Sequence, residues 1–208
     1  AVLTAAQQER CTSLYGVPTM FIAELAHPEF DRFDLSSLRT GVMAGSPCPV
    51  EVMKQCVDRM NMVDVTICYG MTETSPVATQ TLPDDSLHHR TATVGRAHPH
   101  VEVRIADPET GATLRRGEVG EFCTRGYSVM QGYWNDPDRT ADAIDADGWM
   151  DTGDLAVMAD VGAAFDEGKG EVIPGVGIEE DEDAGGPPDP CLLRRRLALL
   201  EAPQLFVL

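Results

Sequence analysis

Residues 40 to 69 read TGVMAGSPCPVEVMKQCVDRMNMVDVTICY, and this stretch decides the fold class. Its two ends, Thr40 to Ala44 and Val63 to Tyr69, are short, apolar and rich in β-branched residues, as buried strands are. Between them apolar side chains recur every three or four residues, at Val50, Met53, Val57 and Met60. That spacing predicts an amphipathic helix, with Ser46 as its cap and Pro47 in its first turn. The order strand, helix, strand predicts a parallel α/β sheet, which binds ligands at the carboxyl ends of its strands.

The pattern changes from Thr91 onward. Val101, Val103 and Ile105 alternate with polar residues, turn signals follow at 107–108 and 110–111, and Glu118 to Arg125 is a further strand-like run. We therefore expect residues 1–90 to be an α/β portion and residues 91–159 to be a β-rich, antiparallel, barrel-like subdomain.

The charge is concentrated toward the end of the chain. Residues 1–159 hold 23 acidic and 12 basic side chains, a net charge of -11, while residues 160–208 hold 11 and 4, a net charge of -7. The run Glu179 to Asp183 and the Gly- and Pro-rich residues after it cannot bury enough apolar surface to offset chain entropy. We expect an acidic, disordered tail over 160–208. Its last part, Leu192 to Leu208, is either a frayed end or a short basic docking helix for an unknown partner.

The whole-chain composition excludes several classes of partner. A net charge of -18 disfavours nucleic acid and anionic membranes, both of which reward clustered Lys and Arg. No apolar run approaches the roughly 18 to 20 residues that span a bilayer. The six cysteines form no CxxC pair, so we expect reduced, buried thiols in an intracellular compartment, and an inert core thiol at Cys68.

The densest polar cluster is YGMTETSP, from Tyr69 to Pro76. Gly70 permits a sharp turn at the strand end, after which come a hydroxyl at Thr72 and a carboxylate at Glu73. An aromatic ring can stack on a base, a hydroxyl can bond a phosphate, and Mg²⁺ prefers one or two carboxylates together with phosphate. The alternative is an ordinary capped loop.

A second cluster is DGWMDTGD, from Asp147 to Asp154. A carboxylate accepts two hydrogen bonds from neighbouring hydroxyls and can hold a ribose diol. The alternative is a solvated Asp-Gly turn.

Histidines gather at 88–89, 98 and 100, in a region rich in Pro and Asp that we expect to be a surface loop. They lack the neighbouring Cys and the paired spacing of zinc sites, so solvated histidines are the preferred interpretation over a metal site.

Taken in order, these segments resemble the adenylate-forming enzymes, the family of acyl-CoA synthetases, luciferases and peptide-synthetase adenylation domains. The resemblance covers about residues 11 to 159 and rests on YGMTE at 69–73, TVGR at 93–96, GEVGEFCTRGYSVMQGYW at 117–134 and DGWMDTGDL at 147–155. The segments YGVPTMF at 15–21 and AGSP at 44–47 are most similar to medium-chain fatty acyl-CoA synthetases.

The resemblance implies a role for each matching residue. Tyr69 would stack on adenine, and Gly45, Ser46 and Pro47 would form the opposite wall. Thr72 would touch the α-phosphate, Glu73 would hold Mg²⁺ and Asp154 would bind the ribose hydroxyls. Gly70, Met71 and the segment 17–20 would border the acyl chain, and Gly95 would lie where the chain enters the barrel-like subdomain.

The implied activity is that of an acid–thiol ligase. A fatty carboxylate attacks the α-phosphorus of ATP to give acyl-adenylate and pyrophosphate, and coenzyme A then forms the thioester. ATP, Mg²⁺, coenzyme A and a fatty acid would be the cofactor and partners. The compartment would be the mitochondrial matrix in a eukaryote and the cytoplasm in a bacterium.

The sequence departs from the family in two places. We expect no match in these residues to the Gly- and Ser/Thr-rich phosphate loop or to the small domain that supplies a catalytic lysine, and the lysines of this sequence are Lys54 and Lys169. We therefore expect the chain to carry part of the site, with a non-catalytic nucleotide-binding or regulatory module as the alternative function.

Overall fold

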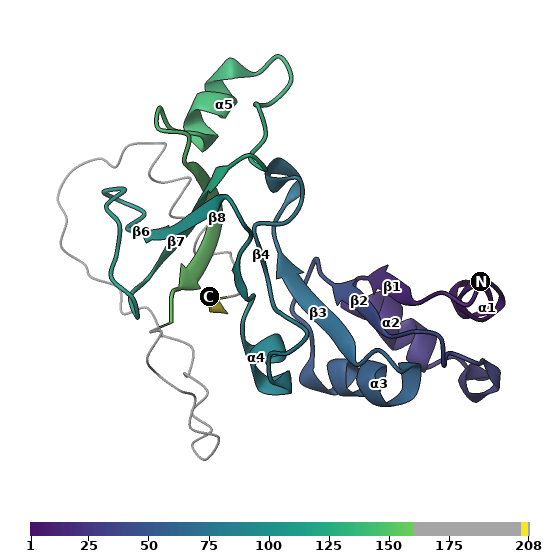
Figure 1. The fold of residues 1–208 in the computed structure, drawn as a ribbon. Helices are drawn as coiled ribbons and strands as arrows, with labels where there is room; N and C mark the ends of the chain where they lie inside the picture. Colours follow the sequence, from purple (N-terminus) through teal and green to yellow (C-terminus); the bar gives the residue numbers. More distant parts are fainter. Residues whose placement is uncertain (160–204, 208) are drawn as a thin grey trace.

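A computed structural model describes residues 1–159 and 205–207 (Figure 1). Its helices are α1 (Val2–Gln8), α2 (Pro18–Leu25), α3 (Val50–Met60), α4 (Leu87–Ala92) and α5 (Pro137–Ala143), with 3₁₀ turns η1 (Phe30–Arg32) and η2 (Thr72–Thr74). Its strands are β1 (Ser13–Gly16), β2 (Thr40–Met43), β3 (Asp64–Tyr69), β4 (Thr79–Gln80), β5 (Arg96–Ala97), β6 (Val101–Ala106), β7 (Val119–Gly126), β8 (Met150–Val157) and β9 (Leu205–Val207). Within this described part, no helix has both the length and the apolar character that crossing a membrane requires.

The first sheet has the strand order β1-β2-β3-β4-β5. Strands β1, β2 and β3 are parallel, whereas β4 and β5 add in antiparallel orientation. Helices α2, α3 and α4 lie along one side of this sheet (Figure 1). The predicted parallel α/β unit is therefore confirmed, with β2, α3 and β3 as its strand, helix and strand.

Helix α3 begins at Val50, later than the predicted start at Pro47. Proline disfavours helical backbone in the residue before it, and Pro47 and Pro49 impose this restriction on Ser46 and Cys48 in succession. Pro49 itself is the N-cap residue, with extended backbone and no side-chain cap. The segment between β2 and α3 is consequently an extended loop, and Ser46 is free for another role.

The apolar face of α3 packs into the core beneath the first sheet. Val52, Met53, Cys56 and Met60 of this helix are buried, whereas Val50 is exposed. The main core cluster joins α1, α2, α3 and the inner strands through Leu3, Ala6, Phe21, Leu25, Phe30, Leu35, Leu38, Met43, Cys48, Val52, Met53, Cys56, Met60, Met62, Val65 and Ile67.

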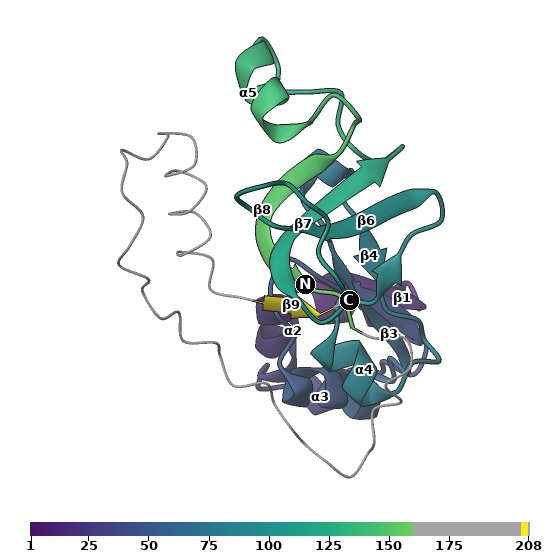
Figure 2. The same ribbon diagram turned by 90° about the vertical axis from the view of Figure 1, so that its left-hand side faces the viewer.

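The second sheet has the order β6-β7-β8-β9, and its first three strands are antiparallel, as predicted for this half (Figure 2). Ile105, Phe122 and Ala156 form its buried face, and they pack with Tyr69 at the end of β3. A side chain of the first sheet therefore belongs to the core of the second.

The acidic tail was predicted to be disordered up to residue 208. Residues 160–204 and 208 lie outside the described residues, and so do the acidic run and most of the possible docking helix. Leu205–Val207 form β9, which pairs in parallel with Leu155–Val157 of β8. For these three residues neither a frayed end nor a helix is correct, because backbone hydrogen bonding to β8 adds them to the sheet.

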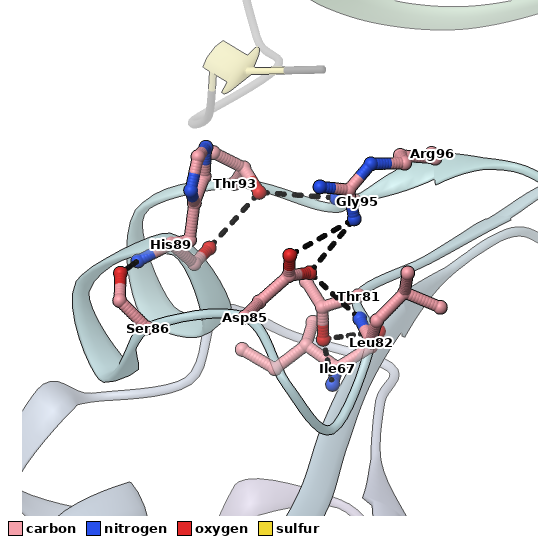
Figure 3. A network of polar contacts seen from close by, with 9 residues as sticks. All are labelled: Ile67, Thr81, Leu82, Asp85, Ser86, His89, Thr93, Gly95 and Arg96. Atoms are coloured by element: carbon pink, nitrogen blue, oxygen red, sulfur yellow. Dashed lines mark hydrogen bonds and ion pairs between the residues drawn. The ribbon is translucent and has the colours of Figure 1, made fainter. Parts of the chain in front are cut away.

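A polar network lies near α4, where the chain enters β5 (Figure 3). Asp85 accepts two hydrogen bonds from Arg96, at 2.9 and 3.0 Å, and one from the backbone N–H of Leu82. Gly95 has φ +83°, and a β-carbon there would lie 2.1 Å from the carbonyl carbon of Gln80. The chain thus turns tightly at Gly95 into β5, which pairs with β4 of the first sheet. The division at residue 90 remains an expectation.

The predicted histidine loop is partly wrong. His88 and His89 lie in α4, because Ser86 caps this helix by accepting a hydrogen bond from the backbone N–H of His89. His98 and His100 lie outside helices and strands.

Candidate functional site

A cavity of about 1160 Å³ opens at the carboxyl ends of the parallel strands and extends to β8. It is lined by Tyr15, Gly16, Val17, Met20, Val42, Ala44, Gly45, Ser46, Pro47, Cys48, Ile67, Cys68, Tyr69, Gly70, Met71, Thr72, Pro76, Val77, Gln80, Thr91, Ala92, Thr93, Val94 and Asp154. Ligands bind in this position in open α/β sheets. Every residue predicted to contact the nucleotide lines this cavity except Glu73.

One wall is the extended loop between β2 and α3. Gly45, Ser46 and Pro47 are exposed there, next to the buried Cys48. Gly45 has φ +87°, which favours glycine, and a β-carbon would lie 3.2 Å from Cγ1 of Val17. Pro47 and Pro49, which move the start of α3 to Val50, therefore also leave this wall extended and accessible.

A second wall is the loop after β3. A β-carbon on Gly70 would lie only 1.9 Å from the carbonyl oxygen of Pro76, so this position accepts glycine alone without a shift of the backbone. The buried hydroxyl of Thr74 accepts a hydrogen bond from the N–H of Met71 and donates to the carbonyl of Met71, each at 2.9 Å. Sequence reasoning missed Thr74, which lies three positions after Met71, the N-cap residue of η2.

Tyr69 joins the two sheets. Its hydroxyl donates a 2.6 Å hydrogen bond to Oδ2 of Asp154, and its ring meets Phe122 edge-on, with 4.9 Å between the ring centroids. Burial raises the pKa of the Tyr69 hydroxyl, and the neighbouring Asp154 carboxylate raises it further. The hydroxyl therefore stays protonated and remains a donor at neutral pH.

Asp154 is held by contacts of the two residues that precede it in β8. Thr152 donates through its hydroxyl to the carbonyl of Phe122 at 2.7 Å and accepts from the N–H of Asp154 at 3.2 Å. Gly153, with φ +78°, donates through its N–H to Oε1 of Glu121 at 3.0 Å. These contacts fix the DTGD segment on β7, whereas Asp147, earlier in the same cluster, is exposed in a turn.

Glu73 lies beside the cavity and outside its wall. Its Oε1 accepts a 2.9 Å hydrogen bond from the hydroxyl of Tyr133, and its backbone carbonyl accepts one of 2.8 Å from the N–H of Met130. Sequence reasoning did not identify Tyr133, whose tie to Glu73 spans sixty positions of the chain. Thr72, next to Glu73, is exposed and lines the cavity.

Two thiols that were expected to be core residues line the cavity. Cys68 is only half-buried, because the end of β3 turns this side chain toward the opening, and its description as a core residue is wrong. Burial raises the pKa of Cys48 to about 11 and also raises that of Cys68. Both thiols are therefore protonated and weakly nucleophilic at neutral pH.

Across residues 1–159 and 205–207, no three His, Cys, Asp or Glu side chains are grouped as a metal site requires. The described residues that line the cavity also include no Lys, Arg or His, and Asp154 is the charged side chain among them. A bound triphosphate would need cations in addition to these residues.

Known proteins are similar to this chain in sequence and in fold. The family model of the AMP-binding enzyme matches residues 1–134. The putative acyl-CoA synthetase YngI of Bacillus subtilis (strain 168) is 60% identical over 161 residues, which are 77% of this chain and 29% of that protein. The mitochondrial medium-chain acyl-CoA ligase ACSF2 of Homo sapiens is 44% identical over 160 residues, 77% of this chain and 26% of that protein.

Solved structures of other proteins have a similar fold. The amide bond synthetase McbA from Marinactinospora thermotolerans superposes with a TM-score of 0.68 at 37% identity, over 76% of this chain and 32% of that one. The anthranilate CoA ligase AuaEII, solved in complex with anthranoyl-AMP, gives a TM-score of 0.67 at 27% identity, over 74% and 29% of the two chains.

The chain spans less than a third of the length of these relatives. The family model covers the quoted motifs up to residue 134, including the two loops that follow β2 and β3 and line the cavity. The chain therefore belongs to the AMP-binding enzyme family, the adenylate-forming enzymes that include the acyl-CoA ligases.

Proposed function

We propose that this chain carries the adenine, ribose and magnesium part of a ligase that activates a medium-chain fatty acid as its coenzyme A thioester. The observation that carries the proposal is the single cavity lined by the β2–α3 loop, the loop after β3 and Asp154 of β8. Its volume, about 1160 Å³, accommodates a nucleotide together with an acyl group.

Each nucleotide contact has a candidate residue in this cavity. Tyr69 offers an aromatic ring to adenine, opposite the wall formed by residues 45–47. Asp154 is oriented through Oδ2 by the Tyr69 hydroxyl, which leaves Oδ1 for the ribose diol. Thr72 is exposed, and its hydroxyl would donate to an oxygen of the α-phosphate.

The donor set fits Mg²⁺ in its usual form with nucleotides, in which one carboxylate joins phosphate oxygens and waters. Glu73 would supply that carboxylate, and its Oε1 accepts the hydrogen bond from Tyr133. When bound, Mg²⁺ neutralises charge on the phosphates and so reduces their repulsion of the carboxylate substrate.

The reaction has two steps. A carboxylate oxygen of the acid forms a bond to the α-phosphorus, and the bond from that phosphorus to the bridging oxygen breaks, which releases pyrophosphate. The sulfur of coenzyme A then attacks the acyl carbon, AMP leaves with the electrons of the acyl–oxygen bond, and the thiol proton passes to solvent.

The lining supports an apolar acid over a charged one. Val17, Met20, Val42, Ile67 and Val77 form apolar walls. A second carboxylate on the substrate would meet no Lys, Arg or His among the described lining residues. The name of the human relative, a medium-chain acyl-CoA ligase, supports the same substrate class.

A specific observation favours a second candidate, nucleotide binding without catalysis. Lys54 is exposed on α3, pairs with Glu51 at 2.8 Å and does not line the cavity. Without a cation at the reacting oxygens, adenylation by this chain alone would be slow, although binding would persist.

ATP–pyrophosphate exchange with octanoate distinguishes the ligase from the non-catalytic binding module. Octanoate-dependent exchange that Asp154→Asn lowers at least tenfold, while the exposed control Asp58→Asn retains it, supports the ligase. AMP-dependent stabilisation without exchange supports the binding module. If neither AMP nor ATP raises the melting temperature, the nucleotide assignment is wrong for this chain.

A further inference from the structure

Glu73 is held at two points by one segment of the second half of the chain. The N–H of Met130 donates to its backbone carbonyl at 2.8 Å, and the hydroxyl of Tyr133 donates to its side chain at 2.9 Å. Within the described part of the chain, the hydroxyl of Tyr133 is the side-chain group that donates a hydrogen bond to the Glu73 carboxylate. Both the position and the rotamer of Glu73 therefore depend on residues 130–133.

Tyr133 is itself fixed by the start of α5. Its N–H donates to Oγ1 of Thr140 at 2.9 Å, and the guanidinium of Arg139 lies 4.8 Å from the centre of its ring. Thr140 also donates to the carbonyl of Asp136 at 2.8 Å. A β-carbon on Gly132 would approach within 2.7 Å of Thr140, so the segment packs closely against α5.

The geometry leaves one carboxylate oxygen of Glu73 for a ligand. A carboxylate that accepts a hydrogen bond on one oxygen can bind a cation through the other, and such partners fix the orientation of the ligand.

We infer that Tyr133 is a positioning residue for Mg²⁺–nucleotide binding, acting through its hydrogen bond to Glu73. The inference rests on the proposed function, because it takes Glu73 as the magnesium ligand. Tyr133 does not line the cavity, so it acts on the ion through Glu73 and makes no contact with the nucleotide.

The test is calorimetric titration of the full chain with ATP at a series of Mg²⁺ concentrations. Tyr133→Phe removes the hydroxyl and keeps the ring. It is expected to raise the Mg²⁺ concentration for half-maximal ATP binding roughly tenfold, the usual effect of losing a partner behind a metal ligand. ATP affinity at saturating Mg²⁺ should change little, whereas a general structural defect would weaken ATP binding at every Mg²⁺ concentration.

Three further variants complete the experiment. Tyr127→Phe removes the hydroxyl of a neighbouring exposed tyrosine and should behave as the unaltered chain. Arg139→Ala loosens the Tyr133 ring while keeping its hydroxyl, and should shift the Mg²⁺ midpoint in the same direction by less. Glu73→Gln should abolish the Mg²⁺ dependence, and adding Tyr133→Phe to it should have no further effect.

The outcomes separate the two claims. If Glu73→Gln abolishes the Mg²⁺ dependence and Tyr133→Phe leaves the midpoint unchanged, the role of Tyr133 is refuted while the magnesium assignment stands. If Glu73→Gln retains the Mg²⁺ dependence, or the unaltered chain binds no ATP, the proposed function fails and the role of Tyr133 fails with it.

Discussion

The hydroxyl of Tyr69, at the end of β3, donates a 2.6 Å hydrogen bond to the carboxylate of Asp154 on β8. The bond joins the two sheets and sets the distance between two of the predicted nucleotide ligands.

Tyr69→Phe should therefore affect both stability and binding. We expect the free energy of unfolding to fall by about 1 kcal/mol, because the half-buried Asp154 carboxylate regains water in place of the phenol. Nucleotide binding should weaken as Asp154 loses its orientation. Urea unfolding and AMP titration measure the two effects, with the exposed Tyr127→Phe as the control. Equal stability of the two variants would show that the bond contributes nothing measurable.

Gly70→Ala tests the close approach of the loop after β3. The added methyl group would lie 1.9 Å from the carbonyl oxygen of Pro76, so the loop must move. We expect about 1–3 kcal/mol of destabilisation and a loss of nucleotide binding.

Gly111→Ala is the matched control, since its added methyl group meets no atom within 4 Å. That variant should cost only the left-handed backbone penalty, about 1 kcal/mol, and leave nucleotide binding unchanged. Wild-type binding by Gly70→Ala would contradict the described loop geometry.

The buried thiols predict a loss of stability in alkali. Burial raises the pKa of Cys48 to about 11 and that of Cys56 to about 12, from an ordinary value of 9.0. Above pH 9 the unfolded chain loses these protons while the folded chain keeps them, so stability is complete below pH 9 and falls as the pH rises toward 11 and 12. The slope is up to about 1.4 kcal/mol per pH unit for each thiol.

Urea unfolding at pH 8.5, 9.5 and 10.5 measures this slope. Cys48→Ala should make it shallower and should leave the contribution of Cys56 in place. An identical slope in the variant would mean that other groups cause the alkaline loss.

Regular hydrophobic patterns were enough to predict the parallel unit of the first sheet and the first antiparallel strands of the second. The β2–α3–β3 unit and the alternating β6 follow from local spacing, and both are present. The start of α3 was misplaced because a cap and a proline were weighted above the restriction that Pro47 and Pro49 place on the residues before them. β9 was missed because its pairing with β8 joins segments far apart in the chain.

The candidate site, like the fold, could be predicted only in part. The motifs identified eight of the residues that line the cavity. Gly45, Ser46, Pro47, Tyr69, Gly70, Met71 and Thr72 lie at the end of a parallel strand or in the loop after it, and Asp154 lies within β8. The partners of those residues were not predictable from local sequence. Tyr133 reaches Glu73 and Asp154 reaches Tyr69 only after the two sheets have packed together.

An adenine nucleotide should bind across both sheets in the cavity of Tyr69 and Asp154. Two-dimensional ¹H–¹⁵N NMR of the full chain, titrated with AMP, maps the residues that respond to it. The largest amide shifts are expected in residues 44–48, 69–72 and 152–154, with small changes in α5. Shifts confined to α5 and residues 130–144, or no saturable shifts at all, would contradict this expectation.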